Sequence, residues 1–238
     1  MPRSSRAIRG EHRGGFVPTS LSGMVLWLDA GQITGATDNA SLTTWQDRSG
    51  GGRDAVQGGA VALKPIFHST GALLTSTGKP VVTFDGANTW MGFTGLVSAQ
   101  PYTILFVVKD RSTGNARAVL DRGAGATNSI TYQDTDRKWD QYDGTFLSSG
   151  ILTVNTAFTL VTAVHNGASS FIRVNGTAGP TGAVGAGALD NGYLIGEAAG
   201  GNDFWLGEMA EIHIYNRVLT GGEITQDEGY LKTKQGTP

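Results

Sequence analysis

Short apolar runs recur along the chain, and each is bounded by glycine, asparagine, aspartate or proline, which is the pattern of β-strands joined by turns. The run YTILFVVKD at 102–110 is apolar on both faces and predicts a strand that is covered on both sides. The segments 157–167 and 169–176 predict a hairpin, with Asn166 and Gly167 as a type I′ turn pair. The other expected strands cover residues 24–29, 42–47, 64–68, 80–86, 116–121, 129–134, 192–197 and 205–217.

One helix is expected, at the C-terminus. Thr220 and Glu223 form a T-x-x-E capping box. Ile224 and Leu231 then recur seven residues apart, on one face of a helix. Many short strands followed by one short helix predict an all-β protein, a two-sheet antiparallel jelly-roll sandwich with a short C-terminal helix.

Composition supports this fold class and excludes several functions. Glycine supplies 36 of the 238 residues, which suits turns and weakens helices. The absence of cysteine excludes disulfides, thiolate metal sites and cysteine nucleophiles. A net charge of −2 with 16% charged residues argues against nucleic-acid binding, which requires the neutralisation of many phosphates. No apolar run is long enough to span a membrane, so we expect neither nucleic acid nor a membrane as a partner.

The N-terminal segment differs from the rest of the chain. Residues 1–15 hold four arginines against one glutamate, whereas the remainder of the chain is acidic. No apolar stretch follows that would make this segment a secretory signal, so we expect synthesis in the cytoplasm. The segment is either a solvated tail or an anchor that orders on a neighbouring subunit through Arg3, Arg6, Arg9 and Arg13. We expect a basic arm over residues 1–20 and one domain over residues 21–238.

Four segments carry a family resemblance. GMVLWLDA at 23–30 and TWQDRSG at 44–50 form an opening strand and a tryptophan-aspartate turn. PVVTFDG at 80–86, the VNG-ending hairpin at 159–177, and the closing strand and helix at 204–224 follow. In this order they resemble the laminin-G-like branch of the concanavalin A-like lectin/glucanase superfamily, of the kind found on phage and phage-like virion surface proteins. The resemblance implies a jelly roll that more often binds than catalyses.

The superfamily also contains glucanases, so a carboxylate pair has to be considered. Retaining hydrolysis needs two carboxyl groups about 5–5.5 Å apart. The nearest match is Glu208 and Glu211, which point to opposite faces of a regular strand unless a β-bulge intervenes. Met209 and Ala210 stand where the enzyme pattern has an aspartate. We therefore expect no catalytic residues and no enzyme, with a glycoside hydrolase as the least favoured alternative.

The segment TYQDTDRKWDQYDG at 131–144 concentrates carboxylates and aromatic rings. A ring beside carboxylates offers a sugar an apolar face and acceptors for its hydroxyls, which predicts carbohydrate contacts at Trp139, Tyr142, Asp140 and Asp134. Clustered carboxylates can also bind calcium, the only cofactor considered, and the candidate ligands are Asp134, Asp136, Asp140 and Asp143. The third interpretation is a polar hairpin in which Trp139 only covers a sheet edge.

Two further groups of residues have both a functional and a structural interpretation. Trp90 and Trp205 are either additional aromatic platforms or core side chains. His213 shares a strand face with Glu211 and Tyr215, so the three form either a hydrogen-bonded trio or a polar sheet face.

Two functions remain open at this point. The first is a non-enzymatic structural and adhesive subunit on the surface of a phage or phage-like virion, a head or tail decoration or a fibre. It would be anchored to other virion subunits by its arm, oligomeric in the assembly, and would present the jelly roll to cell-surface polysaccharide. The second is a free-standing lectin-like carbohydrate-binding module, for which the arm would be dispensable.

Overall fold

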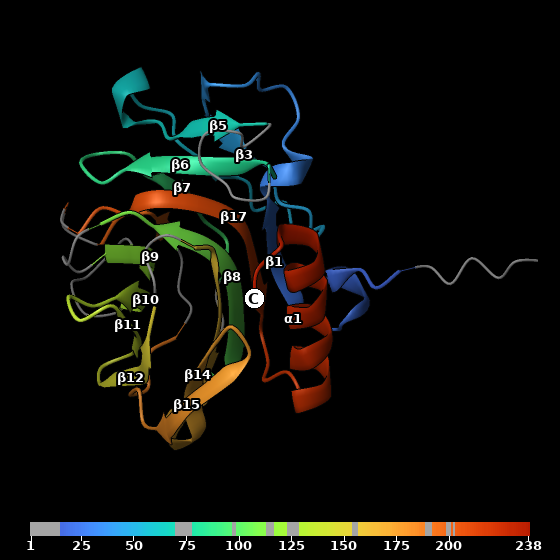
Figure 1. Ribbon diagram of the computed structural model, residues 1–238, viewed down its shortest axis with the longest axis vertical. Helices are drawn as coiled ribbons and strands as arrows, with labels where there is room; N and C mark the ends of the chain where they lie inside the picture. The colour runs from blue at the N-terminus through green and yellow to red at the C-terminus, as the bar shows by residue number, and fades with distance from the viewer. Residues whose placement is uncertain are drawn as a thin grey trace, which may run out of the picture.

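The computed structural model shows two β-sheets packed face to face, with one α-helix on the outer face of one of them (Figure 1). It describes residues 15–69, 78–96, 99–112, 117–122, 129–153, 157–188, 192–198, 201 and 203–238. The arginines predicted to anchor the arm, Arg3, Arg6, Arg9 and Arg13, lie outside these residues.

Sheet 1 has nine strands. Eight follow the order β15 (Thr177–Gly182), β14 (Ser170–Val174), β13 (Thr159–His165), β8 (Tyr102–Asp110), β17 (Leu206–Tyr215), β6 (Val81–Asp85), β5 (Ile66–His68) and β2 (Ala40–Ser41). The ninth, β1 (Met24–Asp29), pairs with β17.

Sheet 2 has eight strands. Their order is β12 (Phe146–Leu152), β11 (Lys138–Tyr142), β10 (Ser129–Gln133), β9 (Arg117–Arg122), β16 (Tyr193–Ile195), β7 (Met91–Phe93), β4 (Ala55–Val56) and β3 (Thr44–Trp45). The named strands pair antiparallel, and the predicted all-β sandwich with one C-terminal helix is confirmed.

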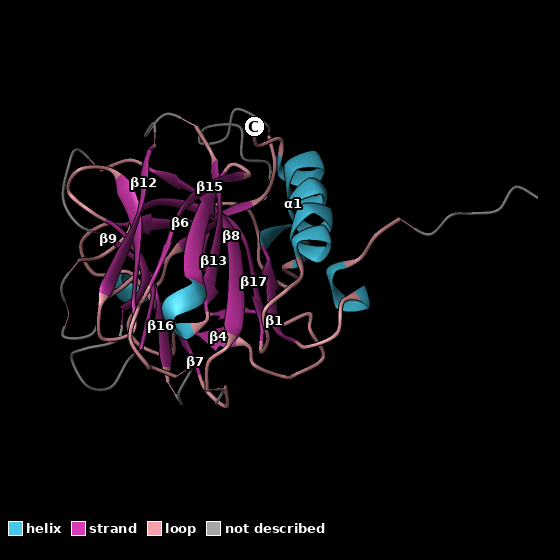
Figure 2. Ribbon diagram, turned by 90° about the horizontal axis from the view of Figure 1, so that it is seen from below, coloured by secondary structure: helices cyan, strands magenta, loops and turns pink. Residues whose placement is uncertain are grey.

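The two faces of β8 explain why its sequence is apolar throughout. Ile104 and Phe106 point into the main core between the sheets, whereas Leu105 and Val107 point to the outer face of sheet 1. That outer face is covered by α1 (Gly221–Gln235), so both faces of the strand are removed from water (Figure 2).

The β13–β14 hairpin is confirmed, but its predicted type I′ turn is wrong. Asn166 has a φ of −149°, whereas a type I′ turn requires a positive φ at both central residues. The chain instead turns through a short 3₁₀-helix, η4 (Gly167–Ser169). The Ser170 hydroxyl accepts from Asn166 N and donates to Gly167 O, each at 2.8 Å, and this closes the turn.

Helix α1 begins with the predicted capping box. Glu223 N donates to the Thr220 hydroxyl at 3.3 Å, and Thr220 N donates to the Glu223 carboxylate at 2.8 Å. The helix ends at Gly236, whose φ of +70° suits a residue without a side chain. Ile224 and Leu231 are buried against sheet 1, as their spacing predicts.

The chain packs against the sandwich from Phe16 onward. The Phe16 ring lies 5.8 Å from the ring of Tyr230 on α1, in an edge-to-face arrangement. Pro18 is buried in the short 3₁₀-helix η1 (Pro18–Ser20), and its carbonyl accepts from the Tyr215 hydroxyl at 3.3 Å. Within the described ranges, no helix is long and apolar enough to cross a membrane.

Candidate functional site

The segment 131–144 contains the end of β10, the turn that follows it and the whole of β11. The best candidate binding surface lies on the outer face of β11 and its neighbour β12. On this face Asp140 is paired with Ser148, and Tyr142 with Phe146, across β11 and β12. The rings of Tyr142 and Phe146 lie 4.4 Å apart at 40°, and Phe146 is 60% exposed. We call Asp140, Tyr142, Phe146 and Ser148 the β11–β12 surface. It combines an aromatic face with a carboxylate and a hydroxyl, the groups that contact a sugar.

Asp140 is the carboxylate of this surface. It is almost buried, and burial raises the pKa of its carboxyl group, although a hydrogen bond from Ser148 acts in the opposite direction. Its Oδ1 atom has no hydrogen-bond partner in the part of the chain that the structure describes. This oxygen is itself buried, so a ligand would reach it only if the surrounding side chains moved.

Trp139, predicted as the main sugar platform, is a core residue, so that prediction is wrong. Side chains alternate along β11, so Trp139 points between the sheets when Asp140 and Tyr142 point outward. Its ring is 1% exposed and lies 5.2 Å from the ring of Phe106 and 6.0 Å from that of Trp205. Trp205 is also fully buried, whereas Trp90 is half-buried.

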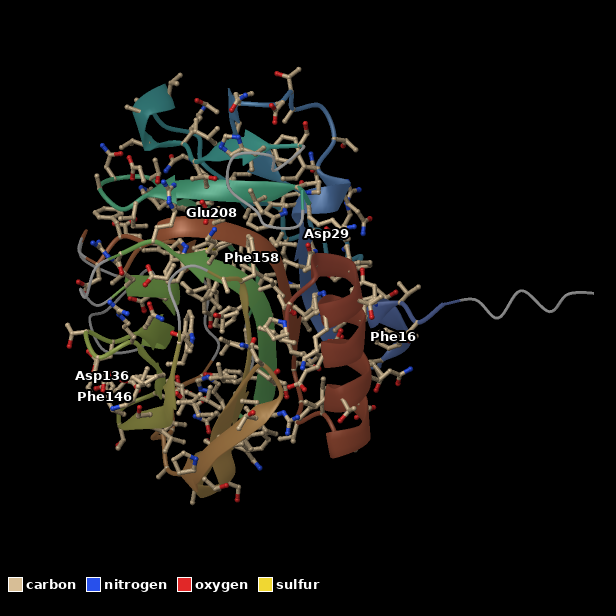
Figure 3. All side chains as sticks on the ribbon, viewed as in Figure 1. Phe16, Asp29, Asp136, Phe146, Phe158 and Glu208 are labelled. Atoms are coloured by element: carbon tan, nitrogen blue, oxygen red, sulfur yellow. The ribbon has the colours of Figure 1, made fainter. Side chains whose placement is uncertain are left out.

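The four aspartates predicted to bind calcium do not come together. Asp134 accepts a hydrogen bond from Thr135 N in the β10–β11 turn. Asp136, labelled in Figure 3, forms an ion pair with Lys138. Asp140 faces outward on β11, and Asp143 is buried at the opposite end of that strand from Asp134. No three His, Cys, Asp or Glu side chains gather to hold a metal ion anywhere in the described ranges, and calcium binding stays a prediction.

Asp143 is instead the centre of a buried polar cluster that the sequence did not indicate. Its Oδ2 atom accepts from the Tyr102 hydroxyl at 2.6 Å and from Gln100 Nε2 at 2.8 Å, and it lies 2.8 Å from His165 Nδ1. These partners come from chain positions more than 20 residues away, so their convergence depends on the packing of the two sheets.

A β-bulge in β17 changes the geometry predicted for Glu208 and Glu211. Glu208 pairs with Lys109 and Glu211 pairs with Val107, two residues apart on β8, because Ala210 is an extra residue in the ladder. The two carboxylates therefore share the outer face of sheet 1 rather than pointing to opposite faces, and the regular-strand prediction is wrong. Both side chains are fully buried (Figure 3 labels Glu208).

Glu211 is surrounded by hydrogen-bond donors beneath α1. Its Oε1 atom accepts from Trp27 Nε1 at 2.7 Å and contacts His213 Nε2 at 3.0 Å. Its Oε2 atom lies 2.8 Å from both Gln235 Nε2 and Lys234 Nζ. Burial alone would raise the pKa of Glu211, but the hydrogen bond and charge of His213, together with Lys234, lower it to about 2.

His213 connects Glu211 to a second carboxylate supplied by α1. Its Nδ1 atom lies 3.1 Å from both carboxylate oxygens of Asp227, and the Tyr215 hydroxyl donates to Asp227 at 2.8 Å. The predicted trio of Glu211, His213 and Tyr215 is therefore formed, but Tyr215 joins it through Asp227 and not directly. Burial would lower the pKa of His213, but Asp227 and Glu211 raise it to about 9. We call Glu211, His213, Asp227 and Lys234 the α1 network.

Glu208 has the opposite environment. Neither of its carboxylate oxygens has a hydrogen-bond partner, and the hydroxyl of Thr83, directly across on β6, also has none within the described residues. Arg111 Nη1 lies 3.5 Å from Oε1. Burial raises the pKa of Glu208 to about 7, although Arg111 and Lys109 act to lower it.

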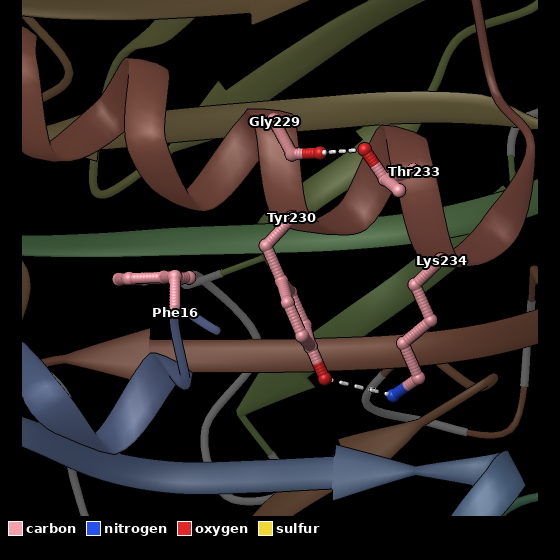
Figure 4. A pocket seen from close by; sticks show the side chains of 5 residues that line it. All are labelled: Phe16, Gly229, Tyr230, Thr233 and Lys234. Carbon is pink, nitrogen blue, oxygen red and sulfur yellow. Dashed lines mark hydrogen bonds between the residues drawn. The ribbon is translucent and has the colours of Figure 1, made fainter. Parts of the chain in front are cut away.

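A shallow pocket of about 410 Å³ lies beside α1, where the N-terminal segment meets the helix (Figure 4). Phe16, Gly229, Tyr230, Thr233 and Lys234 line it. The polar atoms in it already have partners, because Lys234 Nζ donates to the Tyr230 hydroxyl at 3.0 Å and Thr233 Oγ1 donates to Gly229 O at 2.8 Å. The pocket therefore offers a ligand mainly the aromatic rings.

Comparison with solved structures shows the same architecture in several binding domains. The binding domain of Paraclostridial Mosquitocidal Protein 1 is 11% identical, with a TM-score of 0.66, over 93% of this chain and 56% of that one. Trypanosoma rangeli sialidase in complex with sialic acid is 15% identical, with a TM-score of 0.58, over 91% of this chain and 34% of that one. The chain thus spans only about a third of the sialidase.

A third structure matches along almost its whole length. Domain 4 of AbnA, an extracellular arabinanase from Geobacillus stearothermophilus, in complex with arabinotriose, is 14% identical, with a TM-score of 0.55, over 86% of this chain and 97% of that one. At these identities the likeness shows the fold alone.

Comparison of the sequence with protein families and with curated proteins gives one match. No curated protein matches the chain. The family described as the concanavalin A-like lectin/glucanases superfamily matches residues 74–225, which is more than half of the chain. On this evidence the protein belongs to the concanavalin A-like lectin/glucanases superfamily, as its strand motifs indicated.

Proposed function

We propose that the protein is a non-enzymatic carbohydrate-binding jelly roll that contacts polysaccharide through the β11–β12 surface. The observation that carries this proposal is the Tyr142–Phe146 ring pair, in which Phe146 is 60% exposed and Tyr142 is half-buried. Stacking of a sugar ring on these two side chains supplies the apolar contact. The fold, shared with a domain seen in complex with arabinotriose and with a toxin binding domain, supports it.

The proposal of a binding rather than a catalytic role is supported by the two glutamates of β17. A glycosidase needs an acid and a second carboxylate that both reach the sugar. Glu211 is enclosed by the α1 network, and Glu208 is fully buried. Neither carboxyl group is exposed to a polysaccharide.

The binding role predicts that Tyr142→Ala and Phe146→Ala each weaken glycan binding by about 1–3 kcal/mol, the typical loss of one aromatic anchor. The glycan is first identified on an array in calcium and in chelator, and affinities are then measured by titration calorimetry. Leu152→Ala is the matched control, because Leu152 is a 68% exposed apolar side chain of the same strand without a ring. Equal binding by all three variants and the unaltered protein would remove this surface as the site.

We further propose that the jelly roll is displayed on the surface of a phage or phage-like particle and is anchored there by the basic arm. The support is the charge contrast between the arginine-rich residues 1–15 and the acidic remainder of the chain. Sedimentation and native mass with and without residues 1–15 test this anchor. Assembly that depends on the arm while folding stays intact supports it, and assembly that does not depend on the arm favours a free-standing lectin-like module.

A further inference from the structure

Besides the pocket next to α1, the structure has a pocket at the opposite side of the sandwich from the β11–β12 surface. It is a pocket of about 340 Å³ between the loop that follows η2 (Ala30–Gln32) and the strands β2 and β3. Strands β2 and β3 end the two sheets at one side, whereas β12 ends sheet 2 at the other side (Figure 1). Small-molecule sites in proteins have volumes of about 300–1,000 Å³, so this pocket is large enough for one small ligand.

The pocket is polar but uncharged. Hydroxyl and amide side chains supply most of its polar lining, and we call them the hydroxyl pocket: Thr34, Thr37, Ser41, Thr43, Thr44 and Gln46. Ala36 and Ala40 supply apolar surface, whereas the Leu42 side chain is buried in the core. A ligand with a net charge would find no opposite charge in this lining, and its desolvation would not be compensated.

The charged residues beside the hydroxyl pocket already have partners. Lys64 Nζ donates to the Thr43 hydroxyl at 3.0 Å, and Asp38 accepts from Ser69 N at 2.7 Å. Both groups therefore help to hold the rim rather than attract an ion.

The walls of the pocket are held in place without a ligand. The Gln46 side chain accepts from Thr34 N at 3.4 Å and donates to Thr34 O at 3.1 Å, which ties the loop to the segment after β3. The backbone amide of Leu42 donates to Pro65 O at 2.8 Å. Among the described residues, no hydrogen bond uses the side-chain hydroxyls of Thr37, Ser41 or Thr44. The site thus combines a fixed shape with hydroxyls that are available to a ligand.

We propose that the hydroxyl pocket binds one ring of a neutral sugar or a polyol of similar size. Each threonine or serine hydroxyl both donates and accepts, so it can pair with a sugar hydroxyl in either orientation. Ala36 and Ala40, which are half-buried, contact the C–H surface of the ring. Without an aromatic ring or an ionised group in the lining, the dissociation constant is on the order of 1 mM. This site is separate from the β11–β12 surface and does not depend on it.

The test is an NMR titration of the ¹⁵N-labelled full chain with glucose, galactose and arabinose, and with glucuronate as a charged comparison. We expect saturable shifts of amides within residues 34–46 with at least one neutral sugar, and at least tenfold weaker binding of glucuronate. The double variant Thr37→Val and Thr44→Val keeps the side-chain shape and removes two hydroxyls, so it weakens binding about tenfold. Thr181→Val, an exposed threonine on β15 at the other side of sheet 1, leaves the titration unchanged.

Three results would overturn the inference: no saturable shift within residues 34–46, an equal response of the double variant, or binding of glucuronate as tight as that of the neutral sugars. The signals of residues 138–152 report the β11–β12 surface separately in the same spectra. Tyr142→Ala keeps the response of residues 34–46, so failure of one site can be distinguished from failure of the other.

Discussion

Glu208 and Glu211 lie three residues apart on β17 and face the same side of sheet 1, yet their environments are opposite. Glu211 has four partners at 3.0 Å or less, from β1, β17 and α1, and the pKa of its carboxyl group falls to about 2. Among the described residues Glu208 has no hydrogen-bond partner and only Arg111 at 3.5 Å, and burial raises its pKa to about 7. Both side chains are fully buried, so the difference comes from the partners of Glu211: His213 and Trp27 on sheet 1, and Lys234 and Gln235 on α1.

Of these two buried carboxylates, only the one surrounded by cations and hydrogen-bond donors stabilises the fold. Asp227, Lys234 and Gln235 reach the α1 network from one helix, which is held by its capping box. Glu208 lies on the same face without contacts from that helix. A buried ion without such partners lowers the free energy of unfolding, so we expect ionised Glu208 to destabilise sheet 1.

The largest effect is expected from His213→Leu. This change removes the cation between Glu211 and Asp227 and leaves two buried carboxylates facing each other, which costs about 3–5 kcal/mol of unfolding free energy. Urea denaturation at neutral pH measures the loss. His68→Leu is the matched control, because His68 is half-buried and outside the α1 network, and its cost is expected to stay below about 1 kcal/mol. Equal losses would show that the network adds nothing beyond ordinary packing.

The pH dependence of stability follows from the same two pKa shifts. The folded pKa of His213 is about 9, above its usual value of 6.5, so its contribution is complete below pH 6.5 and is lost as the pH rises through 9. The folded pKa of Glu211 is about 2, below its usual 4.5, so its contribution is present above pH 4.5 and is lost as the pH falls through 2. The α1 network is therefore most stabilising between pH 4.5 and 6.5. Denaturation curves from about pH 2 to about pH 9 test the prediction, and His213→Leu should abolish the loss of stability between pH 6.5 and 9.

Glu208→Gln should have a smaller effect of opposite sign. The folded pKa of Glu208 lies above its unfolded value, so the protein loses stability as the pH rises from 4.5 to 7 because the unfolded chain releases the proton more easily. The amide cannot ionise, so we expect little change at pH 5 and a gain of about 1–3 kcal/mol at pH 8. Glu211→Gln, the matched change three residues away, should destabilise at both pH values. A loss of stability for Glu208→Gln at pH 8 would mean that the Arg111 contact outweighs burial.

The sequence predicted the fold well because strand and cap signals are local. Alternating apolar runs and the Thr220–Glu223 box act over a few residues, and the structure has both, whereas the turn type predicted at Asn166 and Gly167 was wrong. The bulge at Ala210 could not be predicted because it depends on the register between β17 and β8. That single extra residue decided which face Glu211 occupies.

The candidate site was predicted only in part for the same reason. Asp140 and Tyr142 were predicted because the segment is rich in carboxylates and aromatic rings. Trp139 was assigned wrongly because side chains alternate along β11, which places it in the core. No strand was predicted at residues 138–142, so this alternation was not considered. Phe146 was missed because its role depends on the cross-strand pairing with Tyr142. Asp227, Lys234 and Asp143 were missed as partners because their contacts join distant parts of the chain.

The smallest effect is expected at Gly229, in the middle of the helix that supplies the α1 network. A Cβ atom at this position would meet nothing within 4 Å, and the residue is exposed and helical. Gly229→Ala should therefore raise the unfolding free energy by about 0.5–1 kcal/mol through helix propensity alone. Gly207→Ala, beside Glu208, is the contrasting control, because its Cβ would lie 2.0 Å from Lys109 O and the strand would have to move. If Gly229→Ala leaves the free energy of unfolding unchanged, helix propensity does not limit the stability of α1. The difference between the environments of Glu211 and Glu208 then comes from the side-chain contacts of Glu211 themselves.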